Sequence, residues 1–282
     1  MSSNRVVVLG ASGFIGSHLV AQAETSGRDV VGLSSSDIDL SAAEATEMLA
    51  SILRSGDTVV HSAAIAPAKN AAEAAANLIM TDNLVRAAEG LRLGQLVVVS
   101  SDAVYGSASG VVTEKTVCAP DSFHGVMSLG RELTCAEITT DVFTIVRPAP
   151  VYGPGDTHNS YGPNRFTRQV LDDGQISIFG EGVSGRDHVA VEDVASVIVR
   201  SMTQLESGVV NVASGQMRSF LEVAEIVRSA APSGVGVSSV GSETNPTFRS
   251  FDVSDLIRRF PDHVPTLPEI GIPAMLRAMG KS

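Results

Sequence analysis

Short apolar runs alternate with helical patterns through the first half of the chain. The runs are rich in β-branched residues, as is typical of strands that are buried on both faces of a parallel sheet. Between them, apolar residues recur with helical spacing, which predicts helices that cover the sheet. We expect strands at 6–9, 29–33, 58–61, 96–100 and 143–146, and helices near 14–26, 42–54, 71–89 and 126–139.

Strands that alternate with helices are joined by right-handed crossovers, so the pattern predicts a doubly wound parallel sheet. After residue 147 the pattern loosens, because glycine, proline and asparagine crowd 148–164 and the tail from 233 is rich in serine, glycine and proline. We therefore expect an α/β protein with one domain over 1–164, to which a segment near 189–213 returns. Residues 165–282 should form mainly a smaller, interleaved lobe.

Composition narrows the possible partners. The 282 residues include 31 acidic and 20 basic ones, and this acidic balance argues against nucleic acid. There is no run of eighteen apolar residues that would predict a membrane span, and no signal-peptide pattern. Two cysteines, Cys118 and Cys135, make neither a disulfide framework nor a metal site. We expect a cytoplasmic protein without metal, nucleic acid or membrane partners.

Three evenly spaced glycines, Gly10, Gly13 and Gly16, follow the first predicted strand and open the first predicted helix. The first permits a tight turn, the second lets the backbone approach a pyrophosphate, and the third lets helix and sheet pack closely. The helix N-terminus then offers unpaired N–H groups and a positive dipole end to phosphate. The turn predicts that 1–164 is a dinucleotide-binding Rossmann domain.

The end of the second predicted strand bears on the choice of cofactor. A carboxylate there would bind the ribose of NAD, and an arginine would accept the extra phosphate of NADP. The chain has Ser34 and Ser35 instead, whose hydroxyls suit either group, so NAD and NADP both stay open. Asp39 is expected to contact the adenine region or to cap the next helix.

Further motifs follow in a characteristic order. They are His61-Ser62-Ala63-Ala64, Asn77 with Asn83, Ser100–Gly106, Arg147–Pro154, Asn164-Arg165-Phe166, Arg186–Val194 and Asn211–Gly215. In order and spacing, the chain resembles the extended short-chain dehydrogenases/reductases, the NAD-dependent nucleotide-sugar epimerases and dehydratases, over almost its whole length. The resemblance implies a dinucleotide in the first lobe and a nucleotide-activated sugar in the second, so residues 165–282 are expected to be mainly a substrate-binding lobe. The expected cofactor contacts are Gly10, Ser12, Gly13, Phe14, Ile15, Gly16, Ser34, Ser35, Asp39, Ser62, Ala63, Ala64, Asn83 and Pro148.

The catalytic motif of the family is altered in this chain. The resemblance implies a serine at a strand end, here Ser101, and a Tyr-x-x-x-Lys pair, but His124 and Ser128 occupy the positions of the tyrosine and the lysine. A phenol needs a nearby cation to work at neutral pH, whereas an imidazole, with a pKa of roughly 6.5, does not. His124 is therefore the candidate proton donor and acceptor, Ser101 orients the substrate oxygen, and Ser128 contacts the ribose. Tyr105 is a reserve proton donor.

The resemblance also implies substrate contacts. Arg186 matches an arginine that grips the diphosphate of the sugar nucleotide, and forked guanidinium donors suit a pyrophosphate. Arg165 and Asn164 are expected near the same site. Pro150, however, stands where many relatives carry an asparagine that faces the diphosphate.

Two functions of different class stay open. The first is an NAD(P)-dependent oxidoreductase or epimerase of a nucleotide-linked sugar or a related hydroxyl or keto compound. The alternative is a catalytically impaired dinucleotide-binding sensor or partner subunit, since the tyrosine and lysine are missing. A lyase-like reaction would need further acid and base groups, and Asp102, Glu114 and Asp121 have no motif support for that role. By analogy with relatives, a homodimer through helices 71–89 and 126–139 is expected.

Overall fold

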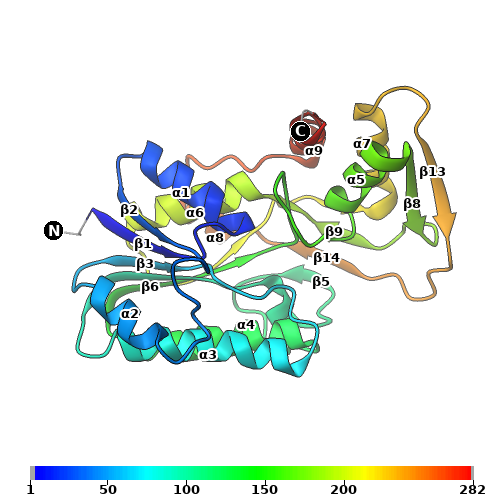
Figure 1. Ribbon diagram of the computed structural model, residues 1–282. Coiled ribbons are helices and arrows are strands. Elements are labelled where there is room, and N and C mark those ends of the chain that lie inside the picture. The colour runs from blue at the N-terminus through cyan, green and yellow to red at the C-terminus, as the bar shows by residue number, and fades with distance from the viewer. Residues whose placement is uncertain (1–3, 281–282) are drawn as a thin grey trace.

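The computed structural model describes residues 4–280 and is built on a six-stranded parallel sheet with the order β11-β6-β4-β3-β1-β2 (Figure 1). The strands are β1 (Arg5–Leu9), β2 (Asp29–Leu33), β3 (Thr58–His61), β4 (Leu93–Val99), β6 (Thr140–Pro148) and β11 (Gly208–Val212). Every residue of β3 is buried, and its two valines fit a strand that is covered on both faces of a parallel sheet. The predicted Rossmann-like, doubly wound sheet is confirmed, although β11 had been expected only within the returning segment.

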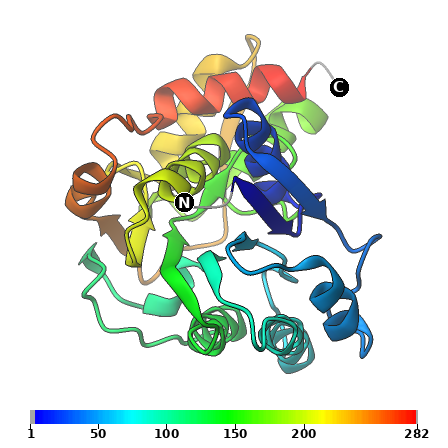
Figure 2. The ribbon, with the colours of Figure 1, turned by 90° about the vertical axis from the view of Figure 1, so that its left-hand side faces the viewer.

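Helices cover both faces of the sheet, as Figures 1 and 2 show. On one face lie α1 (Phe14–Thr25) and α6 (Val191–Gln204), which pack against each other; on the other lie α2 (Ala45–Ile52), α3 (Ala71–Ala87) and α4 (Phe123–Cys135). Leu19 and Ile198 belong to the first core and Leu49 and Leu84 to the second, all of them fully buried. Burial of each such side chain contributes about 1.5–3 kcal/mol.

The smaller part of the molecule has its own core, which includes Phe166, Val223 and Ile272. Its largest sheet has the order β12-β9-β14-β5. The strands outside the central sheet are β5 (Gly110–Val112), β7 (Val151–Tyr152), β8 (Gln175–Phe179), β9 (Gly185–Asp187), β10 (Val189–Ala190), β12 (Met217–Ser219), β13 (Gly236–Val240) and β14 (Phe248–Phe251). The remaining helices are the 3-10 helix η1 (Asp102–Tyr105), α5 (Pro163–Asp173), α7 (Phe220–Ala230), α8 (Ser254–Arg259) and α9 (Pro268–Met279).

Segments cross between the two parts of the chain. The early strand β5 pairs with the late strand β14, and the late strand β11 joins the central sheet beside β6. The predicted boundary at residue 164 stays a prediction, because the two parts share these segments. Within residues 4–280, no helix combines the length and the apolar character that crossing a bilayer requires.

The strand order fixes where a ligand can bind. The chain leaves β1 for β2 on one side and returns to β3 on the other side. Such a reversal opens a crevice beyond the carboxyl ends of the strands, where open α/β sheets bind their ligands.

Candidate active site

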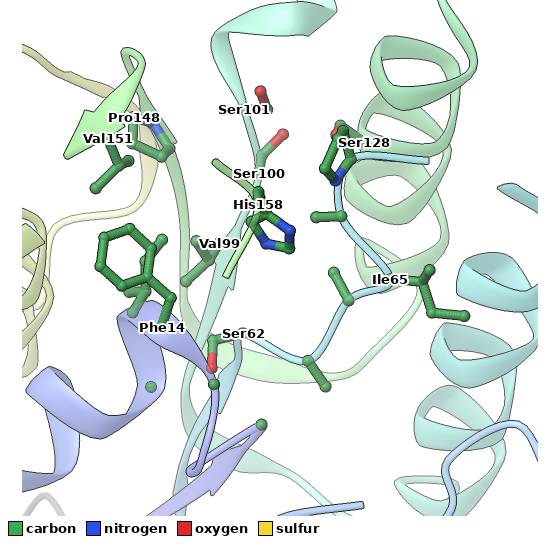
Figure 3. A pocket seen from close by; sticks show the side chains of 18 of the residues that line it. Phe14, Ser62, Ile65, Val99, Ser100, Ser101, Ser128, Pro148, Val151 and His158 are labelled. Carbon is green, nitrogen blue, oxygen red and sulfur yellow. The ribbon is translucent and has the colours of Figure 1, made fainter. Parts of the chain in front are cut away.

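A cavity of ≈ 650 Å³ occupies this crevice. Figure 3 shows Phe14 and Ser62 toward one end of its lining and Ser100, Ser101 and Ser128 toward the other. The first end is formed by the glycine-rich turn and the loops that follow β2 and β3, and the second by the loop after β4 and by α4. We call them the phosphate end and the reaction end.

The phosphate end is shaped by backbone. Gly10 has a φ of 87°, and a β-carbon on it would lie 2.7 Å from the nitrogen of Ala63. A β-carbon on Gly16 would overlap the carbonyl oxygen of Gly10. No side chain caps the N-terminus of α1 at Gly13, so its first N–H groups face the cavity unshielded. This cradle fits the pyrophosphate of a dinucleotide.

Carboxylates stand beside the loop after β2. Asp37 accepts hydrogen bonds from the backbone N–H (2.8 Å) and the hydroxyl (2.6 Å) of Ser34, and Asp39 accepts two from Ser41. These hydrogen bonds hold the pKa of both carboxyls below the ordinary value. Ser34, Ser35 and Asp39 line the cavity, so this loop presents negative charge to it.

Asn83 lies behind that loop instead of in the cavity. Its amide donates to the carbonyl oxygens of Leu40 (2.9 Å) and Ala42 (3.1 Å) and therefore holds the loop in place. All the other predicted cofactor contacts line the cavity. The prediction of a direct contact from Asn83 is not supported, because its amide group is already used by the backbone.

The reaction end brings Ser101, His124 and Ser128 into one cavity. Ser101 is the N-cap of η1, and its hydroxyl accepts a hydrogen bond from the N–H of Ala103 (3.1 Å). His124 lies in the first turn of α4. Ser128 is 1% exposed and donates to the carbonyl oxygen of His124 (2.8 Å). The hydroxyl of Ser128 is thus tied to its own helix.

His124 is held in its neutral form. Burial lowers its pKa, and Arg131 and His158 act in the same direction. Its Nδ1 is buried and has no hydrogen-bond partner among residues 4–280. A neutral imidazole with a free ring nitrogen can accept a proton at pH 7.

Tyr105 lies outside the cavity. It is 1% exposed, and its hydroxyl donates to Oδ1 of Asn211 (2.7 Å) and accepts from Nη1 of Arg147 (3.1 Å). Burial raises its pKa. The predicted role as reserve proton donor is contradicted, because the hydroxyl is buried in this network and does not face the cavity.

The three predicted substrate contacts also lie outside the cavity lining. The Arg186 guanidinium donates to the carbonyl oxygen (2.8 Å) and hydroxyl (2.7 Å) of Thr247. Asn164 bridges the backbone of Val151 and Gly153, and the exposed Arg165 lies over the ring of Tyr161. None of the three lines the cavity, although Arg186 lies close enough to Asp102 of the reaction end to act on the pKa of its carboxyl.

Other residues at the reaction end were missed or set aside. Asp102 lines the cavity in an ion pair with Arg249 (2.8 Å), and burial raises the pKa of its carboxyl. Arg131 lines it from α4, two helical turns after His124, a spacing that the sequence could have revealed. His158 reaches it from the loop before α5, where no periodic pattern exists to predict a position.

The fold and cavity define a dinucleotide-binding α/β protein in which a phosphate cradle meets a serine and a histidine. The model of the NAD dependent epimerase/dehydratase family matches residues 6–213, and the chain belongs to this family. The membership confirms the predicted family and the nicotinamide dinucleotide as cofactor class. It does not choose between NAD and NADP.

Known proteins agree with this assignment. The chain is 29% identical over 261 residues to a dTDP-4-dehydro-6-deoxy-D-allose reductase of Streptomyces sp, covering 79% of each chain. It is similar to the solved structure of MoeE5 with UDP-glucose and NAD (TM-score 0.79, 25% identity, 98% and 99% of the two chains). The fold is also that of RMD from Pseudomonas aeruginosa, solved with NADPH (TM-score 0.83, 22% identity, 98% and 99% covered).

Proposed function

We propose that the chain is an NAD(P)-dependent oxidoreductase or epimerase that acts on a nucleotide-linked sugar or a related hydroxyl or keto compound. The observation that carries this proposal is the single cavity that joins the glycine cradle to Ser101 and His124. The alternative, an impaired sensor, would also keep the glycine cradle, but it gives no role to the half-buried, neutral imidazole of His124 in the same cavity as Ser101.

In this reaction, the nicotinamide ring would exchange a hydride with a carbinol carbon of the substrate. Ser101 donates a hydrogen bond to the reacting oxygen and so orients it. His124 accepts the hydroxyl proton while the C–H bond gives up its hydride and the C=O bond forms. In the reverse direction, protonated His124 returns the proton to the oxygen. The proton and the hydride balance the loss of two hydrogens from the substrate.

The substrate class is proposed from the relatives and from one cationic pair. Arg186 of β9 and Arg249 of β14 are register partners on neighbouring strands, and Arg249 also pairs with Asp102 at the reaction end. Two guanidinium groups this close suit a diphosphate, which would draw Arg186 away from Thr247. The relatives named above act on dTDP-linked sugars or were solved with UDP-glucose.

The cofactor preference proposed here is NAD over NADP. Asp37 and Asp39 flank the loop after β2 and stay ionised, and the cavity-lining residues of that loop include no arginine or lysine. Carboxylates at this position accept hydrogen bonds from a ribose and repel a ribose phosphate.

We further propose that two copies pair through α3 and α4, as the resemblance suggests. These neighbouring helices expose Ile79, Val126 and Leu133 by 49%, 50% and 66%. Light scattering after size-exclusion chromatography should report a dimer for the wild type and a monomer for Leu133→Asp. A wild-type monomer would remove this proposal.

The central test replaces His124. In His124→Phe, turnover of a responsive sugar nucleotide, followed at 340 nm, should fall by about 10²–10⁴-fold, because the proton acceptor is lost. Calorimetry should show an unchanged Kd for the dinucleotide. Tyr105→Phe is the matched control, since it removes a hydroxyl outside the cavity and should leave turnover within about threefold. Unchanged turnover in His124→Phe would exclude His124 as the proton acceptor. If the wild type binds the dinucleotide tightly but turns over no sugar nucleotide, the sensor function would be favoured.

A further inference from the structure

Arg131 is a buried cation at the floor of the cavity. It is 2% exposed and lines the cavity from α4. Its guanidinium donates to the carbonyl oxygens of Val99 (3.1 Å), His61 (3.3 Å) and Ala63 (3.0 Å). One arginine therefore ties α4 to the carboxyl ends of β3 and β4, from which the cavity lining continues.

Burial lowers the pKa of the Arg131 guanidinium, and the nearby carboxylate of Glu132 opposes this effect without overcoming it. Within residues 4–280 no carboxylate forms an ion pair with it. The adjacent Glu132 is already engaged by Arg147 (2.6 Å) and by the hydroxyl of Ser100 (2.5 Å). The Nε of Arg131 is buried without a hydrogen-bond partner in the same range. A buried charge of this kind destabilises a fold, so its presence at a cavity suggests that it serves the site.

Helix geometry directs this charge toward His124. The two residues are seven positions apart on α4, so they share a face about 10 Å apart along the axis. Side chains on a helix lean toward its N-terminus, which brings the guanidinium closer to the imidazole. Ser128 lies between them and carries no charge.

We propose that Arg131 is a positioning residue that fixes the cavity floor and keeps His124 unprotonated, ready to accept the substrate proton. This proposal rests on the role of His124 proposed above. A purely structural clamp would account for the hydrogen bonds to the strand ends. With a purely structural clamp, the pKa of His124 would not depend on the charge of the side chain at position 131.

Other charged groups lie on the segments that pack around His124. The 3-10 helix η1 contributes Asp102, which is neutralised by Arg249, and the loop before α5 contributes Asp156, which is paired with Arg168. His158 of that loop lowers the pKa of His124, after burial and Arg131. Further charged groups on packed segments are Asp121, before α4, and Lys69 and Glu73, at the start of α3. Of the arginines and lysines in residues 4–280, Arg131 is the one that lines the cavity, and no carboxylate in this range forms an ion pair with it.

The test is an NMR titration of the His124 ring in the protein without substrate, assigned by loss of its signal in His124→Phe. The wild type should titrate below the ordinary value near 6.5. Arg131→Met should raise the pKa of His124 by about one unit, and Arg131→Lys, which keeps the charge, should leave it near the wild-type value. A folded Arg131→Met with an unchanged pKa of His124 would overturn the proposal.

Ser128→Lys keeps the proposal testable if Arg131→Met does not fold. This change adds a cation one turn closer to His124 while Arg131 still holds the strand ends, so the pKa of His124 should fall further. In Arg131→Met/Ser128→Lys the added charge should restore the low value. Failure of Ser128→Lys to move the pKa would overturn the electrostatic account. The titration needs no turnover, so its result is separate from the His124→Phe assay, which tests the proposed function.

Discussion

The two ends of the cavity differ in which atoms form them. At the phosphate end, the backbone of three glycines and a helix N-terminus forms the cavity wall, and this end keeps the glycine pattern of the family. At the reaction end, side chains carry the chemistry, and two of the expected residues are replaced by His124 and Ser128. No other residue can replace the glycines of the backbone cradle, because any side chain would fill it. The tyrosine that carries the proton in the family can be replaced, because an imidazole can also carry a proton.

The largest effect is expected at the phosphate end. In Gly16→Val the β-carbon would overlap the carbonyl oxygen of Gly10, so the Kd for the dinucleotide should rise by more than about 100-fold. Calorimetry measures the Kd, and circular dichroism checks the fold. Gly13→Ala is the milder variant, because its β-carbon would lie 3.1 Å from the same oxygen. It should weaken dinucleotide binding more than it lowers the stability of the fold.

Gly27→Ala is the matched control for this end. A β-carbon there meets nothing within 4 Å, although its φ of 80° makes the change cost about 1 kcal/mol of stability. It should leave dinucleotide binding unchanged. A folded Gly13→Ala with wild-type affinity would show that the turn does not hold the phosphates.

The difference between backbone and side-chain sites also explains which features the sequence could predict. The parallel strands Asp29–Leu33 and Thr58–His61 were predicted with the bounds that the structure gives, because each is a short run rich in valine. Thr58–His61 is buried throughout, whereas Asp29–Leu33 is an edge strand with two exposed residues. The cradle was predictable because glycine spacing encodes backbone shape. The partners of polar side chains could not be predicted in this way. Arg186 was expected at the substrate but donates hydrogen bonds to Thr247, and the hydroxyl of Tyr105 lies in a buried hydrogen-bond network. Spacing along a chain does not say which of several partners a long or polar side chain will meet.

The second prediction restores at position 124 the tyrosine that the family carries at the reaction end. In His124→Tyr, kcat/KM at pH 7 should fall by about 10–100-fold and should recover as the pH rises, because a phenol has a pKa near 10. The nearby Arg131 should keep part of this activity by favouring the phenolate. A pH series of initial rates measures the effect, with Tyr105→Phe as the reference for a change outside the cavity. A wild-type rate with an unchanged pH profile would mean that position 124 moves no proton.

The third prediction concerns the ribose side of the phosphate end. Asp37→Ser/Asp39→Ser removes the negative charge beside the loop after β2, so the preference for NAD over NADP should fall by about tenfold. Competition binding with the two dinucleotides measures the ratio, and the preference should be most sensitive at low ionic strength because both carboxylates are exposed. Asp262→Ser, exposed before α9, is the charge control. If the wild type binds NADP more tightly than NAD, these carboxylates do not select the cofactor.

The smallest effect tests whether burial, with a smaller contribution from a nearby arginine, can hold a histidine neutral, as is argued for His124. His188 is 2% exposed in the smaller part of the molecule, and burial, followed by the charge of Arg186, lowers its pKa to about 3. In the unfolded chain the ordinary value is near 6.5. Between these two values the unfolded chain binds a proton that the native state does not, so stability falls as the pH drops below about 6.5.

Replacing His188 by leucine should remove this dependence. Between pH 7 and pH 5.5, the wild type should lose about 1 kcal/mol more of its free energy of unfolding than His188→Leu does. Urea denaturation at the two pH values measures the free energy of unfolding of both proteins. An equal loss in wild type and His188→Leu would show that burial does not keep this imidazole neutral. The neutral state of His124 would then have to depend on Arg131 more than on burial, which the titration of Arg131→Met measures directly.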